Sequence, residues 1–258
     1  MSRSMKHIAS KDNALFKMLF RIENSVRERR EQGKTILDGV HLLDACISAG
    51  VKPELVVARE SSRDAPEIRP FLQDGNVASM SDSLFDRISP VKNPTGILAL
   101  ISIPLREPLE QPEFCVFLDE IRDPGNMGAI LRSAAAAGAT DVFLSKGCAD
   151  PWSPKVLRAG MGAHFSIRIH ADSELAGLIR NFHGNAIALS LDADISLFDL
   201  DLKGRVGFVI GNEGAGISRE ILSVAGVRAR IPMPGRIESL NAAQAASVCF
   251  FERVRQMA

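Results

Sequence analysis

Five short apolar runs in the second half of the chain constrain its fold more than any other feature. They are CVFLD (115–119), DVFLS (141–145), SIRIH (166–170), AIALS (186–190) and VGFVI (206–210). Each has the length and composition of a buried strand, and helical stretches lie between them. This alternation predicts a mostly parallel sheet with helices on both faces. Ligands of such sheets bind beyond the carboxyl ends of the strands.

The first hundred residues predict a smaller α/β unit. Apolar residues at helical spacing predict an amphipathic helix over 13–30, followed by strands at 35–39, 54–58 and 96–103 and a helix at 41–50 that Gly50 closes. Three prolines and mixed charges then interrupt the pattern in PLREPLEQPEF (104–114). We therefore expect two domains, 1–103 and 113–258, joined by a linker at 104–112.

Charge and cysteine usage limit the function classes. The formal net charge is zero, with 31 basic and 31 acidic residues, so no global field attracts a polyanion. Residues 1–34 carry a local excess of basic residues, which alone is typical of a solvated helix. The four cysteines are scattered, so neither a disulfide framework nor a metal site is expected. Without an apolar signal core or a long apolar run, we expect a cytoplasmic protein that does not enter membranes.

The first segment that carries chemistry is LDEIRDPGNMGAILRSAAAAG (118–138). It predicts a strand that ends at Asp119, a Pro-Gly turn, and an Ala-rich helix that Asn126 opens and Gly138 closes. Arg132 lies six residues after Asn126. Alone, this is an ordinary strand-turn-helix. The segment lacks the glycine and lysine pattern of phosphate-binding loops and dinucleotide folds, which disfavours both.

The second segment, FVIGNEGAGIS (208–218), takes an apolar strand directly into Gly211, Asn212, Glu213, Gly214 and Gly216. Glycines cost conformational entropy, so their density is expected where the backbone needs a positive φ or a close approach. The alternative is a flexible surface turn.

The third segment, ARIPMPGRIESLNAAQAASVCFFERV (229–254), passes from a strand through a Pro-rich loop into a terminal helix. Ser239 and Asn241 can cap that helix. Its apolar face, formed by Val248, Phe251 and Val254, is expected to pack on the sheet or on a partner subunit.

In this order and spacing, the three segments resemble the motifs of the SpoU (TrmH) family within the SPOUT methyltransferase superfamily. The resemblance covers about 113–258 and rests on Asn-x-Gly-x-x-x-Arg, Ile-Gly-x-Glu-Gly-x-Gly and Ile-Pro-Met-x-Gly…Glu-Ser-Leu-Asn. A weaker similarity over 38–60 and 93–101 extends to the family's N-terminal RNA substrate-binding domain. Asp38 and Thr95 stand there in place of the family's Glu and Gln.

The resemblance implies a C-terminal trefoil knot, a rare exception to the rule that chains do not thread their own loops. It also implies S-adenosylmethionine as cofactor and a homodimer formed through the catalytic domain. The activity implied is methyl transfer to a ribose 2′-hydroxyl of structured RNA, with ribosomal RNA favoured over tRNA. The cofactor-binding residues that the resemblance indicates are Gly211, Asn212, Ile231, Met233 and Leu240.

The same resemblance makes Arg132 the catalytic arginine, with Asn126, Glu213, Ser239 and Asn241 in the same site. A guanidinium keeps its proton in proteins, so we expect Arg132 to hold the adjacent phosphate and to stabilise the developing alkoxide, not to act as a base. Asn126 would position Arg132 or the ribose. Glu213 would hold hydrogen-bond geometry or accept the proton.

Two other functions remain open from the sequence. One is a catalytically inactive RNA-binding protein of the same fold, although such a protein has no need of this set of polar residues. The other is transfer to a base atom, but a cytosine C5 enzyme needs a nucleophilic cysteine, and none of the four cysteines lies within the three motifs. With no Tyr and a single Trp, Trp152, an aromatic platform for bases is not expected, and Trp152 is predicted to be a packed loop residue.

Overall fold

The computed structural model describes residues 5–73, 75–89, 91 and 94–258. The chain forms two compact units. Unit 1 contains the chain up to Leu105 together with Trp152–Gly162, and unit 2 contains Arg106–Pro151 together with Ala163–Ala258. The sequence prediction placed 152–162 in the second domain. These residues count with unit 1 because they pack against its sheet.

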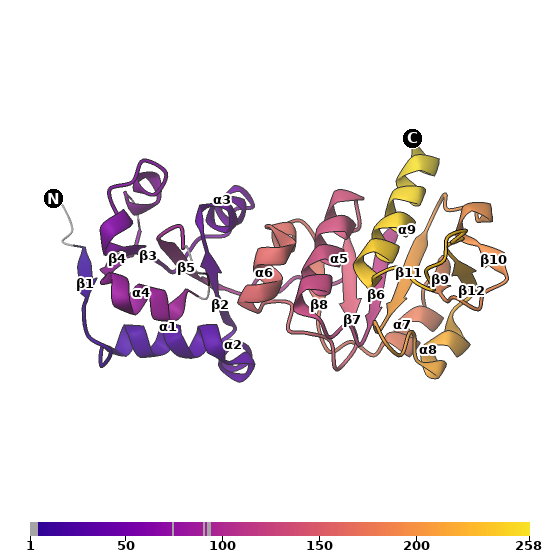
Figure 1. Cartoon of the computed structure of the whole chain (residues 1–258), viewed down its shortest axis with the longest axis horizontal. Helices are drawn as coiled ribbons and strands as arrows, with labels where there is room; N and C mark the ends of the chain where they lie inside the picture. Colours follow the sequence, from indigo (N-terminus) through magenta and orange to yellow (C-terminus); the bar gives the residue numbers. More distant parts are fainter. Residues whose placement is uncertain (1–4, 74, 90, 92–93) are drawn as a thin grey trace. The chain divides into compact units, whose positions relative to one another are not determined.

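Unit 1 is built on a five-stranded mixed sheet in the order β1-β4-β3-β5-β2 (Figure 1). The strands are β1 (Lys6–Ile8), β2 (Lys34–Asp38), β3 (Leu55–Arg59), β4 (Val77–Met80) and β5 (Ile97–Ser102). Its helices are α1 (Ala14–Asn24), α2 (Val26–Gln32), α3 (Val40–Ser48), α4 (Asp82–Ile88) and α6 (Pro154–Gly160), with short 3-10 turns at Glu60–Ser62 and Arg69–Leu72. The three strands predicted here are confirmed as β2, β3 and β5, whereas β1 and β4 were not anticipated.

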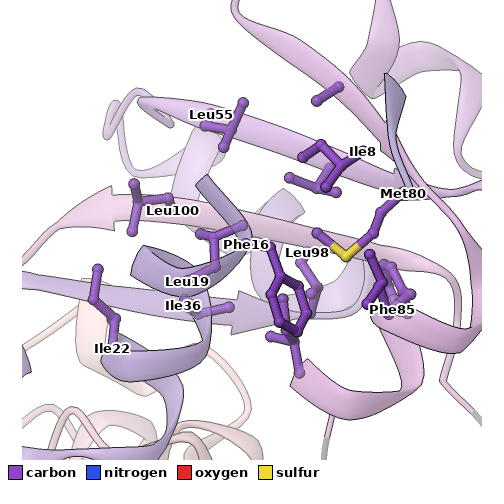
Figure 2. Packing of buried hydrophobic residues seen from close by; sticks show 14 residues of the cluster. Ile8, Phe16, Leu19, Ile22, Ile36, Leu55, Met80, Phe85, Leu98 and Leu100 are labelled. Atoms are coloured by element: carbon purple, nitrogen blue, oxygen red, sulfur yellow. The ribbon is translucent and has the colours of Figure 1, made fainter. Parts of the chain in front are cut away.

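The core of unit 1 lies between the sheet and helices α1 and α4. Figure 2 shows Phe16, Leu19 and Ile22 of α1 pointing toward side chains of β2, β4 and β5, with Phe85 of α4 beside them. Of the apolar face predicted from the helical spacing, Leu19 and Ile22 are buried and Leu15 and Met18 are partly buried, whereas Val26 is exposed and Phe16 was not predicted. Burying each such side chain contributes roughly 1.5–3 kcal/mol to folding.

The single helix predicted over 13–30 is wrong in one respect, because the chain breaks at Ser25. This residue adopts an extended conformation, with φ −130°, and both ends α1 and caps α2. Its hydroxyl accepts a hydrogen bond from the Glu28 N–H, as N-cap serines commonly do. Arg29 is consequently buried, and its guanidinium donates to the Ile22 and Glu23 carbonyls at the end of α1.

Helix α6 attaches to unit 1 through β2. Val156 and Leu157 are fully buried, and the Thr35 hydroxyl donates to the Trp152 carbonyl at 2.7 Å. Trp152 is 8% exposed, so its predicted role as a packed loop residue is confirmed.

Unit 2 is a seven-stranded sheet in the order β10-β12-β9-β11-β6-β7-β8, and every pairing in it is parallel. The strands are β6 (Phe114–Asp119), β7 (Asp141–Leu144), β8 (Arg168–His170), β9 (Asn185–Leu189), β10 (Ile195–Ser196), β11 (Val206–Gly211) and β12 (Val227–Arg230). The helices are α5 (Pro124–Ala136), α7 (Leu175–Arg180), α8 (Arg219–Val224) and α9 (Ala242–Met257), with 3-10 turns at Ala163–Phe165 and Leu197–Asp199. The predicted parallel α/β sheet is confirmed.

Helices cover both faces of this sheet, as Figure 1 shows. Helices α7 and α8 pack on the face that presents Cys115, Phe117 and Val209. On the other face, Phe250 of α9 contacts the rings of Phe114 and Phe208. Period-two alternation along β6 and β11 thus supplies both layers.

The face of α9 formed by Val248, Phe251 and Val254 is not the one that packs on the sheet, and its packing on a partner subunit, the other alternative, stays a prediction. The buried residues of α9 are Ala243, Ala246, Cys249, Phe250, Glu252 and Arg253. Phe251 is 49% exposed, and Val248 and Val254 are only half-buried. Small residues on the buried face let α9 lie close to α5, which leaves Phe251 pointing away from the sheet.

The trefoil knot stays a prediction. Within the described part of the chain, no helix has the length and apolar character needed to cross a membrane.

Candidate active site

A cavity of about 260 Å³ lies in unit 2 at the carboxyl ends of β9, β11 and β12. This is the edge at which parallel sheets bind ligands. Its walls contain all five residues predicted to bind the cofactor, together with Glu213 and Ser239. The lining residues are Leu189, Ser190, Leu191, Ile210, Gly211, Asn212, Glu213, Gly214, Gly216, Ala229, Arg230, Ile231, Met233, Ser239, Leu240, Ala242 and Ala245.

The loop after β11 is a tight turn that closes on itself. Asn212 and Gly216 exchange two backbone hydrogen bonds of 3.0 and 2.9 Å. A Cβ on Gly211 would lie 2.3 Å from the Gly216 carbonyl carbon, so no larger residue fits. Gly216 has φ +71°. Gly214 has no positive φ, and a Cβ there would meet no atom closer than 3.6 Å. The glycines were predicted to allow a close approach to the backbone. At Gly211 the group that approaches is the backbone of Gly216 in the same loop.

The loop between β12 and α9 contributes Ile231, Met233, Ser239 and Leu240 to the cavity. Among residues 232–240, all of which the structure describes, no backbone group takes part in a backbone–backbone hydrogen bond. The side chains around them are largely apolar, including Leu189, Ile231 and Leu240. Apolar walls with unused N–H and C=O groups suit a purine ring, whose faces are apolar and whose edge carries donors and acceptors.

A directional chain of hydrogen bonds joins the three sequence motifs. The Asn241 Oδ1 accepts the Ala243 N–H at 2.9 Å and caps α9, so its Nδ2 must be the donor toward Asn126 Oδ1, also at 2.9 Å. The Asn126 Nδ2 then donates to Glu213 Oε1 at 2.9 Å. The order of donors and acceptors fixes Glu213 as the acceptor at the end of the chain, on the wall of the cavity.

Asn241 is thus confirmed as a cap, and Ser239 makes no capping bond to α9. The predicted start of α5 at Asn126 is wrong. Pro124 is its first residue and Asp123 its N-cap, whose carboxylate accepts the Asn126 N–H at 2.7 Å. Proline is favoured at the first helical position because its φ is already helical and its missing N–H is not needed there.

Arg132 is the predicted site residue that the structure does not bring to this cluster. It is exposed on α5 and does not line the cavity. Six residues along a helix turn the side chain by about 240° and advance it about 9 Å from Asn126. Across the described chain it makes no hydrogen bond or ion pair with another side chain.

Leu189, Ser190 and Leu191 form a cavity wall that was not predicted from the sequence, and Arg230 was not predicted either. Strand β9 itself was predicted, but its place between β11 and β12 is a property of the sheet order. The Arg230 guanidinium donates to the Ala193 and Asp194 carbonyls and so ties the loop after β9 to the end of β12.

Comparisons with known proteins give a consistent result. Residues 113–251 match the SpoU rRNA Methylase family, and residues 13–99 match an MRM3-like substrate binding domain. An uncharacterised tRNA/rRNA methyltransferase of Synechocystis is 30% identical over 96% of this chain and 93% of its own length. The 23S rRNA (guanosine(2553)-2′-O)-methyltransferase RlmP of Bacillus subtilis is 27% identical over 96% and 98% of the two chains. The crystal structure of the SpoU methyltransferase AviRb from Streptomyces viridochromogenes, in complex with AdoMet, is 25% identical and superposes with a TM-score of 0.86 over 95% of this chain and 98% of that one.

Proposed function

This chain belongs to the SpoU rRNA methylase family, and we propose that it transfers a methyl group from S-adenosylmethionine to a ribose 2′-hydroxyl of ribosomal RNA. The observation that carries this proposal is the meeting of the three motifs at one cavity, where a carboxylate is held as a hydrogen-bond acceptor. A relative of nearly equal length is named as a guanosine 2′-O-methyltransferase of 23S rRNA.

The cavity fits the proposed cofactor. Main-chain groups of Gly211, Ile231 and Leu240 would hold it, with Asn212 and Met233 on the same walls. When bound, S-adenosylmethionine supplies a methyl group on a positively charged sulfur. A site with one nearby carboxylate and apolar walls suits such a cation.

The ribose 2′-hydroxyl is a weak nucleophile, so the site must orient it and take up its proton. We assign proton acceptance to Glu213. One of its oxygens is occupied by Asn126, which leaves the other for the substrate hydroxyl. Asn126 and Asn241 act as positioning residues that orient this carboxylate, and Ser239 also lines the cavity.

Arg132 would bind the phosphate next to the target ribose and stabilise negative charge on the reacting oxygen. Its guanidinium is exposed and forms no ion pair with any residue that the structure describes, which supports this contact. We also propose a homodimer formed through unit 2. Phe251 and Met257 of α9, 49% and 54% exposed, support an apolar contact with a second copy.

Unit 1 would supply RNA affinity through phosphate contacts, which makes binding salt-dependent. Several basic side chains near the N-terminus are already paired or buried and are not available to bind phosphate. Lys17 pairs with Asp12 and Arg27 with Glu31, while Arg29 is buried. Exposed Arg21 remains for a phosphate. A cytoplasmic location accompanies this proposal.

Two measurements test the function. Calorimetry should detect binding of S-adenosylmethionine to the intact protein, and maps of 2′-O-methyl marks on total RNA should lose a ribosomal site when the gene is deleted. Loss of a tRNA mark instead would redirect the substrate, and loss of no mark would refute the activity.

Glu213→Gln tests the assigned proton acceptor. Glutamine retains the shape and one acceptor oxygen but cannot take up a proton, so single-turnover methyl transfer should fall by about 10²-fold or more. A rate close to that of the wild type would show that another group receives the proton.

A further inference from the structure

The loop after the central strand β6 contains a residue in an unfavourable backbone conformation. Glu120 has φ +53°, in the left-handed region that side chains with a Cβ rarely adopt. Such a conformation persists only where surrounding contacts hold it, and it is often found beside functional sites. Glu120 lies three residues before Asp123, the cap of α5.

Contacts from both neighbouring strands hold this residue. The Ser145 hydroxyl, which follows β7, accepts the Glu120 N–H at 2.9 Å. From the other side, Asn212, which follows β11, donates its Nδ2 to the Glu120 carbonyl at 2.8 Å. Since β11 and β7 flank β6 in the sheet, the turn is fixed from both sides.

The rest of the Asn212 amide is also occupied. Its Oδ1 accepts the N–H groups of Gly214 and Ala215 at 2.9 and 3.0 Å, inside the turn that lines the cavity. The amide oxygen and one of the two amide N–H groups therefore bond to the protein backbone. The side chain thus contacts both loops, and Asn212 also lines the cavity.

We propose that Asn212 is a positioning residue that couples the cofactor loop to the loop that starts α5. One half of its amide shapes the turn at Gly214, and the other half holds the Glu120 carbonyl. The position of Glu120 sets where α5 begins, and thereby where Asn126 meets Glu213. This inference rests on the proposed function and gives the Asn212 side chain a positioning role in addition to its place on the cavity wall.

Asn212→Asp separates the role of the amide oxygen from that of the amide nitrogen. The aspartate keeps the acceptor for Gly214 and Ala215 but loses the donor to Glu120. Calorimetric affinity for S-adenosylmethionine should stay within about twofold, while the single-turnover rate on ribosomal RNA from cells lacking the enzyme should fall about tenfold, the effect of one lost hydrogen bond. Ser145→Ala, which frees the other side of Glu120, should give the same split. Asn181→Asp, far from the cavity at the end of α7, is the matched control and should change neither quantity.

Rescue distinguishes positioning from a general loss of structure. Adding Glu120→Gly to Asn212→Asp should restore most of the rate, since glycine adopts a positive φ without steric cost and needs no tie. The inference is overturned if Asn212→Asp leaves the rate unchanged, or if affinity and rate fall together and glycine restores neither. A wild-type protein that neither binds the cofactor nor methylates RNA would instead refute the proposed function itself.

Discussion

Asn241 caps α9 and has a proposed role in positioning Asn126, and Asn241→Asp distinguishes the two roles. Its Oδ1 accepts N–H groups of α9 at 2.9 and 3.4 Å, and its Nδ2 donates to Asn126. Aspartate caps helices as well as asparagine does, so the free energy of unfolding should hardly change. Alanine removes the cap, at a cost of about 1 kcal/mol. In a chain of this size that loss lowers Tm by about 2–4 °C.

Activity should depend on the amide nitrogen of Asn241, which donates to Asn126. In Asn241→Asp a carboxylate oxygen faces the Asn126 Oδ1, so that contact is lost and the Asn126 donation to Glu213 is disturbed as well. Two hydrogen bonds at about 0.5–1.5 kcal/mol each predict a rate lower by roughly 10-fold to 100-fold. Thermal unfolding and single-turnover methyl transfer measure the two effects separately. Full activity in the aspartate variant, or a loss of Tm equal to that of alanine, would refute the reasoning.

Three further predictions concern Arg132, Gly211 and Glu23. Arg132→Ala should abolish methyl transfer while cofactor affinity and Tm stay near those of an Arg180→Ala control, because the side chain is exposed and lies outside the cavity; unchanged turnover would show that another residue dominates. Gly211→Ala should destabilise the protein by about 1–3 kcal/mol and weaken cofactor binding measured by calorimetry, because its Cβ would overlap the Gly216 backbone, whereas Gly214→Ala should be tolerated. Burial, with Asp38 nearby, raises the pKa of Glu23 from 4.5 to about 8, so its contribution to stability should be complete below about pH 4.5 and should be lost as the pH rises through 8. Urea unfolding followed by the fluorescence of Trp152, the single tryptophan, should show that slope flattened in Glu23→Gln; an equal slope in both proteins would contradict the assignment.

The sequence was informative wherever a pattern is local. Apolar runs located five of the seven strands of unit 2, and the three glycine- and proline-rich segments follow β6, β11 and β12. Short edge strands such as β1 and β10, with three and two residues, carry too little periodicity to be recognised.

Long-range partners could not be predicted in the same way. Asn126 and Glu213 are 87 residues apart, and only the order of β6 and β11 in the sheet brings them together. The wall at Leu189–Leu191 depends likewise on β9 lying beside β11. Ser25 shows a local failure, since the apolar spacing continued through a residue whose side chain favours capping over helix.

Residues Trp152–Gly162 belong to unit 1, although the chain on both sides of them belongs to unit 2. The polypeptide passes between the units at three points in the sequence, so no single cut separates them. A fragment that starts at Arg106 would carry α6 without β2, its apolar side chains Val156 and Leu157 left in water. Chimeras that exchange RNA-recognition modules between relatives therefore need to transplant residues 152–162 along with the N-terminal segment.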